Sequence, residues 1–163
     1  MKVWVDADAL PGVIKEIITR AAARRTVDTV FVANKTIALP HSSYLSSVQV
    51  ELGTDAADRY ICEQAGSHDL VVTHDLLLAD ALVAQGIIVI DPRGDIYTDK
   101  NIGNRVSARS LMQDLRETGD ITGGPRQFGD KERNRFANAF DRELTRLLRR
   151  CAAEPGEGSA ATN

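Results

Sequence analysis

Five aspartates give this sequence its clearest chemical potential: Asp6, Asp8, Asp55, Asp58 and Asp75. Carboxylate oxygens are the ligands that hard cations such as Mg²⁺ and Mn²⁺ prefer. Carboxylates that converge on one point repel one another, and a divalent cation relieves that repulsion. A cation held in this way can polarise a phosphate ester and activate water. We therefore predict that all five acids contribute to a Mg²⁺ or Mn²⁺ site for phosphodiester hydrolysis, with Asp6, Asp58 and Asp75 as the catalytic acids.

Asp6 and Asp8 follow a short run of β-branched and aromatic residues at positions 3–5, which predicts a buried strand. Ligands of open α/β sheets bind outside the carboxyl ends of the strands, so both acids stand where a ligand is expected. They are two residues apart and share a face if the strand continues, so both could bind one cation. An alternative role for Asp8 is to cap a helix that begins near Pro11.

Asp55 and Asp58 lie at the start of a predicted helix that runs to about residue 65. Asp58 shares a helix face with Ile61 and Cys62, which predicts that its carboxylate is partly buried. A buried carboxylate is costly unless it is paired, hydrogen-bonded or bound to a metal. The alternatives are a capping box for Asp55 and an arginine partner for Asp58.

Asp75 follows a predicted strand at residues 70–73, as Asp6 follows the first strand. If these two strands are neighbours in a parallel sheet, both acids emerge at the same edge, where the helix with the two internal acids also opens. Asp75 is also a natural helix cap, and Asp80 is a supplementary candidate. His74, beside Asp75, could touch such a site, and its alternative is an ordinary surface-loop histidine.

The elements that would position these acids alternate along the chain. Strands are expected near residues 3–5, 29–33, 48–52, 70–73 and 87–90, and helices near 13–22, 54–65, 74–85, 106–118 and 130–150. Residues 40–47 are expected to form a polar loop, and residues 94–103 a loop with a short edge strand. The alternation predicts a three-layer, Rossmann-like α/β fold with a mostly parallel sheet, helices on both faces and additional C-terminal helices.

Composition limits the class of protein. The 163 residues are 43% hydrophobic and 26% charged, which fits one globular domain, expected over residues 1–150. Residues 151–163 are small and polar, and we expect a disordered tail. The two cysteines, Cys62 and Cys151, follow no zinc or disulfide pattern, which favours a reducing cytoplasm. With no leader peptide and no apolar run of membrane length, we predict a cytoplasmic protein without membrane contact.

Charge is unevenly distributed. The net charge of −3 argues against binding nucleic acid through bulk positive charge, yet residues 126–150 hold eight Lys or Arg against four acids. Helical spacing places four arginines on one face, which we call the basic stripe: Arg135, Arg142, Arg146 and Arg149. The basic stripe predicts contacts with an RNA backbone, and its alternative is an ordinary solvated helix surface.

Two further arginines are candidates for binding phosphate. Arg133 is predicted on the apolar side of the last helix, one turn before Phe136, as either a buried partner of an acid or a phosphate clamp. Arg126 ends the segment G-G-P-R at 123–126, whose backbone amides could hold a phosphate, with a simple turn as the alternative. The candidates for nucleic-acid or phosphate binding are thus Arg126, Arg133, Arg135, Arg142 and Arg146.

The order of these motifs resembles that of PIN-domain nucleases, in which an acid ends the first strand, another opens a mid-chain helix and a third follows a strand ending in Thr-x-Asp. Over residues 3–148 the chain more closely resembles the bacterial YaiI/YqxD family of PIN-like proteins. The stretches that carry this resemblance are W-V-D-A-D-A at 4–9, V-I-K-E-I at 13–17, D-A-A-D-R-Y-I at 55–61, D-L-V-V-T-H-D at 69–75, D-P-R-G at 91–94, G-G-P-R-Q-F at 123–128 and F-A-N-A-F-D-R at 136–142.

The resemblance implies a PIN-like fold over the domain. It implies metal binding by Asp6, Asp75 and either Asp58 or Asp55, with Asp8 as a supplementary ligand. Nuclease activity is implied only through the wider PIN-like fold.

Three functions follow from these observations. The first is a Mg²⁺- or Mn²⁺-dependent nuclease acting on RNA. The second is a phosphatase similar to the haloacid dehalogenase type, because D-A-D-A at 6–9 resembles its D-x-D motif and would make Asp6 a nucleophile. Leu10 replaces the usual Thr or Val of that motif, and no lysine is clearly placed. The third is a non-catalytic PIN-like module that binds RNA or a protein through the basic stripe.

Overall fold

The structure of the chain is a computed structural model, and it describes residues 1–117, 119 and 128–154. Its strands are β1 (Val3–Asp6), β2 (Thr29–Ala33), β3 (Leu45–Gln49), β4 (Leu70–Val72), β5 (Ile88–Ile90) and β6 (Ile96–Tyr97). Its helices are α1 (Gly12–Arg25), α2 (Ala56–Gln64), α3 (Leu76–Ala84), α4 (Ile102–Glu117) and α5 (Asp130–Ala153). Of these helices, none is long and apolar enough to cross a lipid bilayer.

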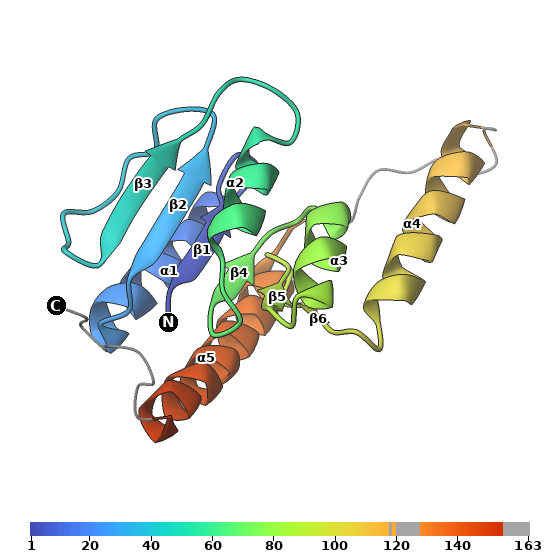
Figure 1. Cartoon of the computed structure of the whole chain (residues 1–163). Coiled ribbons are helices and arrows are strands. Elements are labelled where there is room, and N and C mark those ends of the chain that lie inside the picture. The colour runs from blue at the N-terminus through green and yellow to red at the C-terminus, as the bar shows by residue number, and fades with distance from the viewer. Residues whose placement is uncertain (118, 120–127, 155–163) are drawn as a thin grey trace, which may run out of the picture.

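The strands form one sheet in the order β3-β2-β1-β4-β5-β6 (Figure 1). Strands β1 to β5 pair in parallel, and β6 pairs antiparallel with β5 as a short edge strand. The predicted edge strand within residues 94–103 is therefore confirmed.

Helices cover both faces of this sheet, which confirms the three-layer α/β prediction. Successive residues of β1 point to opposite faces because strand side chains alternate. Val3 and Val5 pack with α1 and α5, where Phe136 and Phe140 stack with ring centroids 5.4 Å apart. Trp4 packs on the other face, with buried residues from α2, α3 and the first turn of α4.

The strand order reverses between β1 and β4. The chain runs outward from β1 through β2 to β3, then returns to β4 on the other side of β1. Val5 consequently pairs with Phe31 on one side and with Val72 on the other. The predicted adjacency of the two acid-bearing strands is thus confirmed. A ligand crevice is expected outside the carboxyl ends of the strands at such a reversal.

Several element boundaries differ from the sequence-based expectation. The third strand is Leu45–Gln49 rather than residues 48–52, so residues 45–47 belong to the sheet and not to the polar loop. These serine-rich residues form an exposed edge strand, where pairing with β2 outweighs their weak hydrophobic signal. Helix α4 begins at Ile102, four residues before the predicted start. Helix α5 continues to Ala153, into the tail predicted to be disordered, and residues 155–163 lie outside the described residues.

The turn between β5 and β6 packs directly against α5. Gly94 has φ +94°, and a Cβ atom at this position would lie 2.6 Å from the carbonyl carbon of Arg135. Only glycine permits both this backbone conformation and this close approach. The turn therefore fixes one end of α5 beside the strands that lead to the crevice.

Candidate active site

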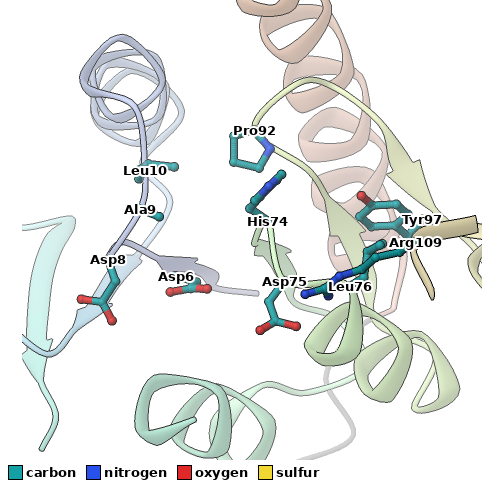
Figure 2. A pocket seen from close by; sticks show the side chains of 10 residues that line it. All are labelled: Asp6, Asp8, Ala9, Leu10, His74, Asp75, Leu76, Pro92, Tyr97 and Arg109. Atoms are coloured by element: carbon teal, nitrogen blue, oxygen red, sulfur yellow. The ribbon is translucent and has the colours of Figure 1, made fainter. Parts of the chain in front are cut away.

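A pocket of about 490 Å³ opens at the carboxyl ends of β1 and β4, where the strand order reverses. Its lining includes Asp6 and Asp8 from the end of β1, Asp75 from the end of β4, and Arg109 from α4. Figure 2 shows the three aspartates in a row, with Asp6 between the other two. The two acid-bearing strands therefore deliver their carboxylates to one cavity, as the sequence predicted.

Asp6 is held by the end of β4. Its Oδ2 accepts a hydrogen bond of 2.9 Å from the hydroxyl of Thr73, which is fully buried. Burial raises the pKa of Asp6, the hydrogen bond from Thr73 lowers it, and the charges of Asp8 and Asp75 raise it again, with a net increase. The ionised form of Asp6 is thus disfavoured in the folded protein, as expected for a carboxylate whose neighbours are also acids.

Asp58 faces the same acids from the first turn of α2. Burial, together with the charges of Asp75, Asp6 and Asp55, raises the pKa of Asp58 to about 6. No arginine forms an ion pair with Asp58 within the described part of the chain, so the alternative of an arginine partner is wrong. Asp58 thus adds a fourth carboxylate beside Asp6, Asp8 and Asp75, although it does not itself line the pocket.

Asp55 occupies the position that caps α2, but its side chain makes no capping hydrogen bond. The capping-box alternative for Asp55 is therefore wrong. Its backbone has φ +75°, an uncommon conformation for a residue other than glycine. The carboxylate of Asp55 is exposed and lies close enough to Asp58 for its charge to raise the pKa of that group.

Asp8 and Asp75 make different backbone contacts. Asp8 Oδ1 accepts a hydrogen bond of 2.8 Å from the backbone N–H of Asn34, at the end of β2. Pro11 occupies the capping position of α1 and that helix has no side-chain cap, so the capping role of Asp8 is wrong. Asp75 does cap α3, because its Oδ1 accepts from the backbone N–H groups of Leu77 and Leu78 at 2.8 and 3.1 Å. The cap uses one oxygen only, so it is compatible with a second role at the pocket.

The donor chemistry of this site fits a hard divalent cation. Asp6, Asp58 and Asp75 offer carboxylate oxygens from three elements, and the repulsion among them is what such a cation relieves. Within the described ranges, however, no three His, Cys, Asp or Glu side chains form a group that could hold a metal ion as they stand. Side-chain rotation would have to bring the carboxylate oxygens closer to one another. The backbones at the ends of β1 and β4 already hold Asp6 and Asp75 at the same pocket.

The sequence did not predict a hydrogen-bonded group of side chains that lies beside these acids. His74 Nδ1 makes a hydrogen bond of 2.9 Å with Asp91 Oδ2, and the hydroxyl of Tyr97 donates to the same oxygen at 3.2 Å. The hydrogen bond to Asp91 raises the pKa of His74. His74 is an exposed loop residue, as interpreted from the sequence, and it also lines the pocket. The sequence signal was the acid at the end of the fifth strand, since Asp91 stands there as Asp6 stands at the end of the first.

The basic stripe lies away from this pocket and is mostly ion-paired. Arg135 donates a hydrogen bond of 2.8 Å to Asp95. Arg142 and Arg146 flank the buried carboxylate of Glu143 at 3.6 and 3.3 Å. Their charges are therefore partly neutralised within the protein, which weakens the expectation of a phosphate-binding row.

Arg133 and Arg126 are the other two arginine candidates. Arg133 is exposed and pairs with Asp130 at 3.6 Å, so its predicted place on the apolar face of the helix is wrong. The face that packs against the sheet begins instead at Phe136. Arg126 and the G-G-P segment before it lie outside the described residues.

The phosphatase alternative gains no support from the pocket. No lysine is among the described residues that line it, and Asp8, the second acid of D-A-D-A, is bound to the backbone of Asn34. Asp80, the supplementary candidate, is exposed on α3 and does not line the pocket.

Taken together, the fold and the pocket define a Rossmann-like α/β protein with an acidic crevice at the point where its strand order reverses. The chain belongs to the YaiI/YqxD family: the family model described as "Uncharacterized BCR, YaiI/YqxD family" matches residues 4–146. This confirms the resemblance seen in the sequence.

Relatives from several bacteria are similar over nearly the whole chain. A UPF0178 protein of Myxococcus xanthus is 53% identical over 149 residues, which cover 91% of this chain and 97% of the relative. One from Syntrophobacter fumaroxidans has the same identity and coverage. One from Psychromonas ingrahamii is 46% identical over 144 residues, covering 88% of this chain and 95% of the relative. No solved structure matches the chain.

Proposed function

We propose that this protein is a Mg²⁺- or Mn²⁺-dependent nuclease that hydrolyses RNA phosphodiesters. The observation that carries the proposal is the proximity of Asp6, Asp58 and Asp75, which come from three elements: burial and mutual repulsion raise the pKa of Asp6 and Asp58, and Asp6 and Asp75 line the pocket. The fold supports it, because the acids stand outside the carboxyl ends of the strands at the reversal of strand order. The resemblance to PIN-domain nucleases supports the choice of RNA.

In this proposal Asp6, Asp58 and Asp75 hold the cation, and Asp8 and Asp55 add negative charge beside it. When bound, the cation would supply Lewis acidity at a phosphate oxygen and would offset the developing negative charge. Thr73 would position Asp6 through the hydrogen bond to Oδ2. The partial burial of these carboxylates lowers the local dielectric, which strengthens their attraction for a cation once it is bound.

The test compares the wild-type protein with Asp6→Asn, Asp75→Asn and the control Asp80→Asn. Both site variants are isosteric, and Asn caps helices as well as Asp does, so the cap of α3 should be retained. Asp80 is an exposed acid on the same helix as the Asp75 cap, but it lies outside the pocket. Mn²⁺ binding is measured by calorimetry, and hydrolysis with a labelled single-stranded RNA.

We expect Asp6→Asn and Asp75→Asn to lower kcat/KM for RNA by about 100-fold or more, because the cation contributes several kcal/mol. Their affinity for Mn²⁺ should fall in parallel, while Asp80→Asn should match the wild type in both measurements. Hydrolysis by Asp6→Asn at the wild-type rate would refute the proposal. So would a wild-type protein that binds no Mn²⁺.

A further inference from the structure

Arg109 is an arginine of the acidic pocket that has no ion-pair partner within the described part of the chain. It extends from α4 into the cavity, and Figure 2 shows its guanidinium directed toward Asp75. The residue as a whole is exposed. A permanent positive charge therefore lies in the same cavity as the carboxylates and forms no ion pair with any of the described ones.

A neighbouring arginine shows that side chains of α4 can form ion pairs with acids of other elements. Arg105, one turn earlier on α4, pairs with Asp95 at 3.5 Å, and Arg135 of α5 reaches the same carboxylate at 2.8 Å. Arg109 faces the pocket instead. Its guanidinium is directed toward Asp75, whose Oδ1 caps α3, yet no ion pair joins these two described residues.

His74 stands beside Arg109 on the wall opposite Asp6. The hydrogen bond to Asp91 fixes the orientation of the imidazole ring and gives the pKa of His74 a net increase, although burial and the charges of Arg93 and Arg109 lower it. Arg109 is thus close enough to act on His74, and both lie on the side of the pocket that also carries Asp75, away from Asp6 and Asp8 (Figure 2).

Because Arg109 shares the pocket with several carboxylates, the cavity suits a ligand that is itself anionic and is bound together with a cation. The guanidinium group presents paired N–H donors that match two oxygens of a phosphate. The carboxylates repel a phosphate directly and accept it only through a cation. Arg109 is therefore the residue of the pocket that can bind phosphate without metal.

We propose that Arg109 is the substrate-binding residue of this pocket, and that its guanidinium binds a backbone phosphate of single-stranded RNA directly, independently of any metal. The choice of RNA rests on the proposed nuclease function, whereas the phosphate contact rests on the geometry of Arg109 in the pocket.

The experiment measures binding of a fluorescein-labelled single-stranded RNA of ten nucleotides by fluorescence anisotropy in EDTA. The variants are Arg109→Gln, Arg109→Lys and the control Arg24→Gln. Arg24 of α1 is exposed like Arg109, has no ion-pair partner among the described residues, and lies outside both the pocket and the basic stripe. Thermal unfolding of each variant verifies the fold, which should not depend on an exposed, unpaired side chain.

We expect Arg109→Gln to raise the Kd for RNA by about tenfold, which is the size of the effect of one charge-assisted hydrogen-bonded contact. The slope of log affinity against log salt should become shallower by about 0.7, because one fewer phosphate is neutralised. Arg109→Lys keeps the charge but loses the paired donors, and its Kd should lie between those of the wild type and Arg109→Gln. Arg24→Gln should stay within about twofold of the wild type, since its charge lies outside the pocket.

Three outcomes would overturn the inference: an unchanged Kd in Arg109→Gln, an equal loss in Arg24→Gln, or no RNA binding by the wild type. Adenosine monophosphate is added as a competitor, and displacement of the RNA at equimolar concentration would assign the site to phosphate monoesters and contradict the proposal. The two proposals fail separately. Loss of binding in Arg109→Gln without metal-dependent hydrolysis in any variant removes the nuclease alone, whereas metal-dependent hydrolysis with unchanged binding in Arg109→Gln removes the Arg109 site alone.

Discussion

Thr73 joins the two strands that carry the acids of the pocket, because its hydroxyl donates a 2.9 Å hydrogen bond to Asp6 Oδ2. The same oxygen of Thr73 accepts a hydrogen bond of 3.0 Å from the backbone N–H of Asp75. One buried hydroxyl therefore fixes the carboxylate at the end of β1 and the backbone at the start of α3. The geometry of the proposed site depends on this single side chain.

Replacing Thr73 with valine tests that dependence. Valine fills a similar volume but neither donates to Asp6 nor accepts from Asp75, so both polar groups lose their partner. We expect Thr73→Val to lower the free energy of unfolding by about 1–2 kcal/mol. The pKa of Asp6 should rise further, because the hydrogen bond from Thr73 lowers it in the wild type. Urea unfolding measures the first effect and NMR titration the second, and Thr73→Ser, which keeps the hydroxyl, should show little of either.

The raised pKa of Asp58 predicts that this site costs stability when no cation is bound. The pKa is about 6 in the folded protein against an ordinary value of 3.8, so protonation favours the fold. That contribution is fully present below pH 3.8 and is lost as the pH rises through about 6. Asn imitates the protonated acid, so Asp58→Asn should stabilise the metal-free protein at pH 7.5. The gain should be about 1 kcal/mol, which allows for the partial exposure of the side chain.

Thermal unfolding in EDTA at several pH values measures this effect. The stabilisation by Asp58→Asn should shrink as the pH is lowered through about 6 toward 4, where the wild-type carboxyl is itself protonated. A destabilised variant at pH 7.5 would show that Asp58 is favourably paired rather than crowded by Asp75 and Asp6. The exposed acid variant Asp80→Asn is the matched control.

Gly94 and Gly86 form a natural pair for testing the turn that packs on α5. Both have positive φ, +94° and +78°, but only at Gly94 would an added Cβ meet backbone, 2.6 Å from the carbonyl carbon of Arg135. Gly86→Ala should cost about 1 kcal/mol from the left-handed backbone alone. Gly94→Ala should cost about 3 kcal/mol, because overpacking adds to the same backbone strain. Denaturant unfolding of both variants measures the difference, and equal losses would contradict the close approach.

The buried carboxylate of Asp91 should control the state of His74. Its oxygens accept hydrogen bonds from His74 Nδ1, from the hydroxyl of Tyr97 and from the backbone N–H of Arg93. Asn at this position keeps one acceptor oxygen and loses the negative charge, so Asp91→Asn should lower the pKa of His74 toward 6.5, its ordinary value. In the wild type the pair stabilises the fold at low pH, and this contribution is lost as the pH rises through the raised pKa.

NMR titration of the His74 ring protons measures this shift directly. Tyr97→Phe is the control, since it removes a neighbour of Asp91 without changing the charge. An unchanged His74 pKa in Asp91→Asn would show that the imidazole does not depend on this carboxylate.

Local sequence patterns were sufficient to predict most strands and helices and to place the acids at the ends of strands. A strand that buries both faces needs a run such as V-W-V, and a parallel strand ends where its side chains turn polar, so Asp6 and Asp75 could be placed at strand ends from the sequence. The helical period likewise placed Asp58 on a partly buried face of α2. The same signals failed at β3, where L-S-S-V-Q carries little hydrophobicity and pairing with β2 determines the strand.

Tertiary structure decided which charges on different elements are paired, whereas a pair such as Arg133 with Asp130 follows helical spacing. No spacing rule distinguishes Arg109, which is left unpaired in the pocket, from Arg105 and Arg135, which share Asp95. The hydrogen bond between His74 and Asp91 likewise joins residues that follow β4 and β5, two neighbouring strands of the sheet. Periodicity and capping act over one or two turns of chain, so the sequence by itself determined the elements and the acids at their ends. The electrostatic energy of a charged side chain depends on groups within a few ångströms of it in space. The order of the strands in the sheet determines which groups those are.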